Sequence, residues 1–196
     1  MAASERNNYK RGWFRRRARR LRHRRFVFVD ETAVNTAMTR RYGRAPRGER
    51  VHDSAPRNYG AHTSVIGALG LRGLVATLAV EGAVDTICFD AYAEHLLGPR
   101  LRRGDVVVLD NLTAHRASRI EEVAASRGAQ VLWLSPYSPD FNPIEQCWSK
   151  IKTFLRGAKA RTAGALDEAL AQAIGLVTQS DIRGWFKHCG YSLARK

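Results

Sequence analysis

The sequence predicts an α/β fold in which helices cover the faces of a mixed β-sheet. Two runs of β-branched and aromatic residues, Phe26–Glu31 and Val106–Asn111, have the continuous apolar character of strands that are buried on both faces. Between Ile144 and Leu155 the apolar residues instead recur at helical spacing and form one stripe. Segments with the strand pattern and segments with the helix pattern therefore alternate along the chain, which favours a layered α/β arrangement.

The N-terminal half is predicted to contain a helix, a central strand and a hairpin. Residues 9–22 are rich in arginine, which favours helix. After the first strand, residues 32–60 are polar and rich in Arg, Gly and Pro, which indicates mostly loop. The apolar stretches 63–69 and 74–80 are joined by Gly70-Leu71-Arg72-Gly73, and this pattern predicts an antiparallel hairpin.

The C-terminal half is predicted to alternate helices and strands before it ends in helices. The expected elements are a helix from Asp85 to about Leu97 closed by Gly98-Pro99, a strand over 106–111, a helix over 117–126, a strand over 131–134, a loop over 135–141, and helices from Pro143, over 164–177 and over 180–188. Pro143 suits the first turn of its helix, where a missing N–H costs nothing, and Asn142 is the expected cap.

Length and charge limit the classes of function. A chain of 196 residues, of which 44% are hydrophobic, suits one domain with a substantial core and a short extra arm. Its formal net charge of +15 creates a positive field that attracts polyanions, chiefly nucleic acid. No apolar run approaches the roughly 20 residues that span a bilayer, so we expect a soluble protein.

The positive charge is concentrated at the N-terminus. Eleven of the 33 basic residues precede Phe26, and only Glu5 opposes them there. One interpretation is a solvated arm whose charges repel each other. The other is contact with DNA phosphates, for which Arg15, Arg16 and Arg19 are candidates together with Lys152 further along the chain.

The cysteines do not predict a metal site. Cys88, Cys147 and Cys189 are odd in number and widely spaced, and no CxxC pair occurs. A zinc ribbon or finger needs such pairs, so we interpret these residues as thiols in a reducing compartment.

Three carboxylates stand at positions that need an explanation. Asp30 and Asp110 each follow an apolar run directly, and Glu145 lies in the first turn of the helix that begins at Pro143. Neighbouring strands would bring both aspartates to one sheet edge, where two anions repel each other unless a divalent cation lies between them. Each acid alone is better explained by a turn or by the helix dipole than by catalysis. Their combination in a +15 chain favours a metal-dependent phosphoryl-transfer site.

The segments that carry these acids resemble those of DDE transposases, in particular the insertion-sequence six-thirty group, the bacterial relatives of mariner elements. The resemblance rests on FVFVDET with MTRRYGRAPRGER, on VVVLDNLTAH, and above all on LSPYSPDFNPIEQCWSKIK. The 35-residue separation of Asp110 and Glu145 is also typical of this group, and the similarity extends over about residues 10 to 190.

The resemblance implies a ribonuclease-H-like fold with a five-stranded mixed sheet flanked by helices. It implies a basic arm over residues 1–25 and a catalytic domain over 26–196. Catalysis and metal binding would fall to Asp30, Asp110 and Glu145, with Asn111, His115 and Asn142 in support. For His115, a structural hydrogen bond at a helix start is an equally good interpretation. Glu31 alternates with Asp30 along the strand, so we expect it to point elsewhere.

The resemblance also implies cofactors and partners. We expect two Mg²⁺ or Mn²⁺ ions per site, double-stranded DNA as transposon end and as target, and a homodimer when active. Members of the group normally carry helix-turn-helix modules before this domain, so we expect end recognition to be either missing or supplied by a separate helix-turn-helix polypeptide. The expected location is the bacterial cytoplasm, on the nucleoid. Two alternatives stay open: a DNA-binding remnant that no longer transposes, and a related metal-dependent nuclease such as a ribonuclease H.

Overall fold

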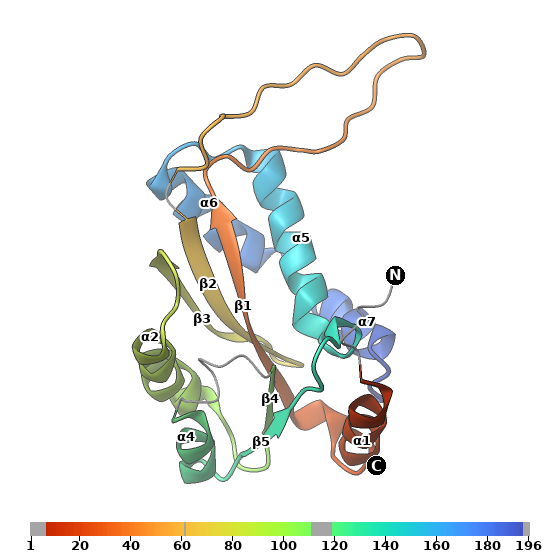
Figure 1. The fold of residues 1–196 in the computed structure, drawn as a ribbon, viewed down its shortest axis with the longest axis vertical. Helices are drawn as coiled ribbons and strands as arrows, with labels where there is room; N and C mark the ends of the chain where they lie inside the picture. Colours follow the sequence, from red (N-terminus) through yellow and green to blue (C-terminus); the bar gives the residue numbers. More distant parts are fainter. Residues whose placement is uncertain (1–6, 61, 111–118, 194–196) are drawn as a thin grey trace.

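The fold is built on a five-stranded mixed sheet, as predicted, and its strand order is β3-β2-β1-β4-β5 (Figure 1). The computed structural model describes residues 7–60, 62–110 and 119–193. The strands are β1 (Phe26–Asn35), β2 (His62–Gly70), β3 (Gly73–Glu81), β4 (Val106–Leu109) and β5 (Gln130–Trp133). The pairs β1–β2 and β2–β3 are antiparallel, whereas β1–β4 and β4–β5 are parallel.

The helices form a layer on each side of this sheet (Figure 1). They are α1 (Asn8–Arg19), α2 (Thr86–Ala91), α4 (Ile120–Ser126), α5 (Pro143–Ala158), α6 (Ala163–Gly175) and α7 (Gln179–His188), with short helical turns η1 (His23–Arg25), η2 (Tyr92–Leu97), η3 (Gly98–Arg100) and η4 (Pro139–Phe141). Asp85 caps α2 as predicted, since its side chain accepts a hydrogen bond from the Cys88 N–H.

Strand alternation divides the interior into two cores. Phe26 and Phe28 of β1 face a core that also contains buried residues of α1, α5, α6 and α7. Val27 and Val29 face the opposite core, which they share with α2, η2 and α4. Because both faces of the sheet are covered where β1 pairs with β4, Phe26–Val29 and Val106–Leu109 are apolar at every position, which is the pattern that predicted these strands.

One expected strand end is wrong, and one expected helix is of mixed type. The first strand does not end at Asp30 but continues to Asn35, because its antiparallel pairing with β2 extends through Asn35 and His62. The helix expected from Asp85 to Leu97 is confirmed in extent, but it consists of α2 followed by the wider turns of η2, and Pro99 lies in the short helix η3.

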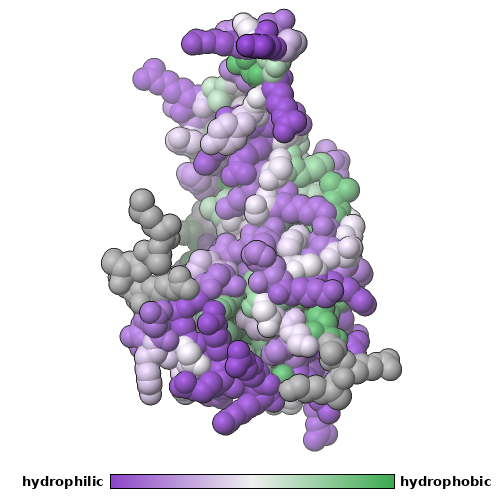
Figure 2. All heavy atoms as spheres, turned by 90° about the vertical axis from the view of Figure 1, so that its right-hand side faces the viewer, coloured by the Kyte–Doolittle hydropathy of each residue, from purple (hydrophilic) through white to green (hydrophobic). Residues whose placement is uncertain are grey.

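A long connection and a polar surface complete the molecule. Residues 36–60 leave the sheet between β1 and β2 and extend away from the body (Figure 1). On the face shown in Figure 2, hydrophilic side chains predominate and green apolar atoms occur in separate small groups. In the described part of the chain, no helix is long and apolar enough to cross a membrane.

Candidate active site

The end of a parallel ladder places two of the three acids together. The pairing of β1 with β4 stops at Val29 and Leu109, so Asp30 and Asp110 are the next residues on neighbouring strands. Asp30 therefore lies inside β1 yet at the edge of the parallel part of the sheet. The two aspartates lie next to each other, as predicted. They do so because β4 ends just before Asp110, whereas β1 continues beyond Asp30.

Glu145 reaches the same place from α5. Asp30, Asp110 and Glu145 all line a hollow of about 450 Å³, together with Asn142 and residues 134–139. Of the three acids, Glu145 is the most exposed, whereas Asp30 and Asp110 are partly buried. The apolar stripe of α5 is buried as predicted, which turns the opposite side of its first turn toward solvent.

Asp30 is held by two hydrogen bonds from its neighbours. Its Oδ1 accepts the backbone N–H of Glu31 at 2.9 Å, and its Oδ2 accepts Nδ2 of Asn142 at 3.3 Å. Asn142 occupies the N-cap position of α5, as expected, but its side chain makes no capping bond. Its side-chain amide instead donates to Asp30. The predicted position of Asn142 is therefore confirmed, but the predicted capping hydrogen bond is absent.

The electrostatics of the hollow disfavour three bare anions. The pKa of Asp30 is raised to about 7, first by burial, then by the negative charges of Glu145 and, to a smaller extent, of Asp110. The pKa of Glu145 is also raised, first by partial loss of solvent, while the Lys152 ammonium opposes the rise. The pKa of Lys152 is lowered, mainly by burial of its ammonium group. The negative charges of Glu145 and Asp30 oppose this change, because they favour the charged form of Lys152.

Hard divalent cations fit this donor set. Carboxylate oxygens are the ligands that Mg²⁺ and Mn²⁺ prefer. Among the described residues, no three His, Cys, Asp or Glu side chains are close enough to hold one ion jointly. Mg²⁺ does not need three, because it keeps several waters and commonly takes one or two carboxylates together with substrate phosphates. The buried Oδ1 of Asn142, which has no hydrogen-bond partner in the described structure, is one more oxygen at this site.

The other residues singled out from the sequence lie apart from this hollow or outside the described residues. Asn111 and His115 belong to the undescribed stretch 111–118. Arg15, Arg16 and Arg19 are exposed on α1. Glu31 alternates away from Asp30 as expected, and its charge is felt by Cys88 near the start of α2.

Two residues of the site were not expected from the sequence. Gly67 pairs with Asp30 across the β1–β2 ladder, and a Cβ built there would lie 2.5 Å from the Trp148 ring. The indole therefore packs directly over the glycine. Its N–H favours the charged form of Asp30, although Nε1 forms no hydrogen bond of normal geometry in the described structure. Helical periodicity identified Trp148 as a core residue, but no local sequence pattern identified Gly67 as the residue against which its ring packs.

A larger hollow of about 820 Å³ lies at the opposite end of the sheet. It is lined by the basic residues Arg19, Arg22, His23, Arg24, Arg25, Arg72, Arg102 and Arg183, with Leu21, Leu71, Asp105, Gly190 and Ser192. Its acid, Asp105, is buried and bound by Arg25 at 3.4 Å and Arg72 at 2.9 Å. The remaining arginines leave this surface strongly positive.

Known proteins share this architecture. The "Mos1 transposase paired-end complex with left transposon end" superposes with a TM-score of 0.77 at 15% identity, covering 97% of this chain and 62% of that chain. The "catalytic domain of Mos1 mariner transposase" superposes with a TM-score of 0.67 at 14% identity, covering 97% and 93%. These likenesses confirm the predicted ribonuclease-H-like fold.

Sequence comparison points the same way. The "Transposable element Tcb2 transposase" of Caenorhabditis briggsae is 26% identical over 147 residues, which cover 70% of this chain and 54% of that protein. The chain thus spans about half the length of this curated relative. Residues 25–167, which include all three acids of the hollow, match the family described as DDE superfamily endonuclease. The chain therefore belongs to the DDE superfamily endonucleases, as the motifs around Asp30, Asp110 and Glu145 predicted.

Proposed function

We propose that this chain is the catalytic domain of a mariner-related transposase, which cleaves DNA at a transposon end and joins the freed 3′-hydroxyl to target DNA. The observation that carries the proposal is the hollow in which Asp30, Asp110 and Glu145 meet and in which burial and the two other acids raise the pKa of Asp30 to about 7. Such mutual repulsion is relieved when divalent cations bind.

The metal ligands of the proposal are the three acids. Asp30 lies close enough to Glu145 and Asp110 for both charges to raise its pKa, so these three carboxylates would hold the two proposed ions together. Bound Mg²⁺ or Mn²⁺ would supply Lewis-acid chemistry at the attacking and leaving oxygens of an in-line phosphoryl transfer. Asn142 keeps the Asp30 carboxyl in place by its hydrogen bond. The Lys152 ammonium beside Glu145 offers a positive charge to a phosphate at the rim.

DNA is the proposed substrate of this site. The structures of Mos1 include complexes with the left transposon end and a strand transfer complex, and we extend double-stranded DNA to this chain as transposon end and target. The exposed Arg15, Arg16 and Arg19 of α1 and the arginine-rich hollow next to it support backbone contacts of low sequence preference. A homodimer, end recognition by a helix-turn-helix polypeptide, and work on the bacterial nucleoid complete the proposal.

A plasmid-nicking experiment tests it. The wild-type chain is incubated with supercoiled plasmid in Mg²⁺, Mn²⁺ or EDTA, and Asp110→Asn serves as the matched variant because it removes one charge with little change of shape. We expect nicks with either metal, none with EDTA or with Asp110→Asn, and unchanged DNA binding by that variant. Cleavage by Asp110→Asn would overturn the metal mechanism. Binding without any cleavage by the wild type would favour a DNA-binding remnant, and preferential cutting of RNA–DNA hybrid would favour a ribonuclease H.

A further inference from the structure

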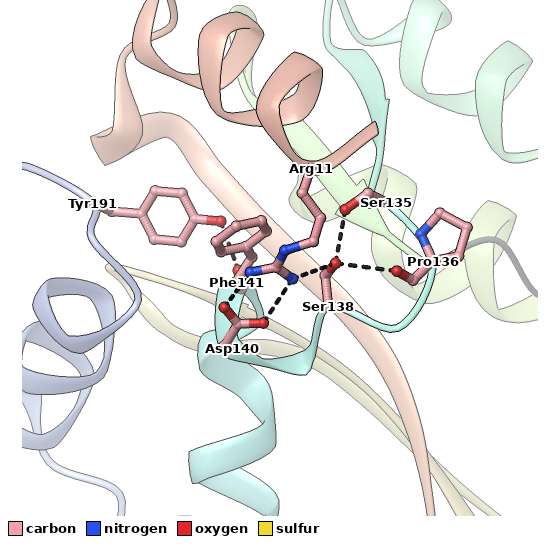
Figure 3. Close-up of polar contacts among 7 residues, drawn as sticks. All are labelled: Arg11, Ser135, Pro136, Ser138, Asp140, Phe141 and Tyr191. Carbon is pink, nitrogen blue, oxygen red and sulfur yellow. Dashed lines mark hydrogen bonds and ion pairs between the residues drawn. The ribbon is translucent and has the colours of Figure 1, made fainter. Parts of the chain in front are cut away.

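One arginine of the basic N-terminal helix is buried in the protein rather than available to DNA. Arg11 of α1 is 3% exposed, and its guanidinium donates to Asp140 through both arms, with Nη1–Oδ1 at 2.9 Å and Nη2–Oδ2 at 2.6 Å (Figure 3). Nη1 also donates to Ser138 Oγ at 2.7 Å. A forked ion pair of this kind fixes both position and orientation of its partner.

The partner of Arg11 is the segment that forms one wall of the acid-lined hollow. Ser138 Oγ lies 2.7 Å from Ser135 Oγ and donates to the Pro136 carbonyl at 3.2 Å, so one hydroxyl ties Arg11 to the whole bend (Figure 3). Between these residues, Tyr137 has a φ of 52°, a conformation that a bulky side chain rarely adopts. Such a backbone persists only where its surroundings hold it.

The same helix also holds the residue that leads into α5. The Arg11 guanidinium lies 4.1 Å from the centre of the Phe141 ring, and Phe14 stacks on that ring at 5.5 Å. The Phe141 carbonyl accepts the Tyr191 hydroxyl at 2.6 Å (Figure 3). Asn142, which bonds Asp30, follows at once, and Glu145 lies within the next turn.

We propose that Arg11 is a positioning residue of the active site: by clamping Ser138 and Asp140, it sets where Asn142 and Glu145 stand relative to Asp30 and so sets the affinity for divalent metal. The inference rests on the proposed function, because it assumes that the three acids bind the metal. It separates the buried Arg11 from the exposed Arg16 and Arg19 of the same helix, whose proposed partner is DNA.

The test compares two buried or half-buried ion pairs that both involve the α5 region. Arg11→Met removes the clamp, and Lys150→Met removes the pair with Asp181, which joins α5 to α7 and does not hold the wall of the acid-lined hollow. For each variant, Mn²⁺ binding to the whole chain without DNA is measured by titration calorimetry, and the melting temperature is measured with EDTA. We expect both variants to melt lower, but only Arg11→Met to bind Mn²⁺ at least tenfold more weakly.

Further variants make the result specific. Asp140→Asn should weaken Mn²⁺ binding like Arg11→Met, and the double variant should be no weaker than either single one, because both remove the same clamp. Equal Mn²⁺ affinity of Arg11→Met and wild type would overturn the proposal and leave Arg11 as a fold-supporting residue. If Arg11→Met does not fold, Arg11→Lys, which keeps the charge but not the fork, decides by the same two measurements. If the wild type does not bind Mn²⁺, or if Asp110→Asn binds Mn²⁺ as tightly as the wild type, the proposed function itself is wrong.

Discussion

Replacing Asp30 by asparagine is expected to stabilise the metal-free protein at neutral and higher pH. Folding raises the pKa of this carboxyl from its ordinary value of 3.8 to about 7. A carboxyl whose pKa is raised destabilises the folded state when it is ionised. The cost is absent below pH 3.8, grows as the pH rises toward 7, and is constant above that.

The size of the effect follows from the two pKa values. A difference of about three pKa units corresponds to about 4 kcal/mol of unfolding free energy above pH 7. Asparagine recovers only part of this, because its amide nitrogen would face one of the two donors, the Glu31 N–H or the Asn142 amide, that now bond the carboxylate. We therefore expect a gain of about 2 kcal/mol at pH 8 and a loss of about 2 kcal/mol at pH 4, because the unfolding free energy of the wild type alone changes by about 4 kcal/mol between these pH values.

Urea unfolding of wild type and Asp30→Asn, measured in EDTA at several pH values, checks this expectation. The informative quantity is the difference in unfolding free energy between the two proteins as a function of pH. Two results would refute the raised pKa of Asp30: a variant that is less stable than wild type at pH 8, or a difference in unfolding free energy that is the same at pH 4 as at pH 8. The same variant should lose Mn²⁺ binding, because the gain and the loss both come from removing one anion.

Three more predictions concern residues around and away from the acids. Asp181→Asn should destabilise the protein at pH 7 but not below pH 2, because Lys150 and Thr178 lower the Asp181 pKa to about 2 and its contribution vanishes as the pH falls through that value; urea unfolding at both pH values measures this. Gly67→Ala should cost about 1–3 kcal/mol because the new methyl group would overlap the Trp148 ring, and unchanged urea stability or unchanged tryptophan fluorescence would contradict it. Arg102→Glu should weaken DNA binding and flatten the log–log salt dependence by about one, and an unaltered slope would show that the basic hollow does not contact phosphate.

The strands and helices were predictable where burial is uniform along an element. Phe26–Val29 and Val106–Leu109 are apolar at every position because both faces of the sheet are covered, and the stripe from Ile144 to Leu155 is buried as its spacing indicated. Residues 32–35 were missed as strand because their pairing depends on β2 and not on their own polarity. Local pattern describes a segment's environment, whereas the extent of a strand is decided by its partner.

The candidate site was predictable in its acids but not in their supports. Asp30, Asp110 and Glu145 stood out because carboxylates interrupt otherwise regular patterns. Arg11 did not, because an arginine within a basic run looks solvated, and its burial depends on Asp140, which is 129 positions away in the sequence. The sequence around Gly67 also did not indicate its role, because that role depends on contact with the Trp148 ring, which lies on a helix distant in sequence.

The position of Asp30 inside a ten-residue strand has a consequence for how the site adapts to its contents. Its backbone is fixed on one side by antiparallel pairs both before and after it, so it serves as a stationary reference point. Glu145, by contrast, lies on the first turn of α5, and its exposed side chain can change rotamer while Arg11 keeps the start of the helix in place. Of the pair Asp30 and Glu145, it is therefore the Glu145 side chain that adjusts its distance to fit ions of different radius, while Asp30 stays in place.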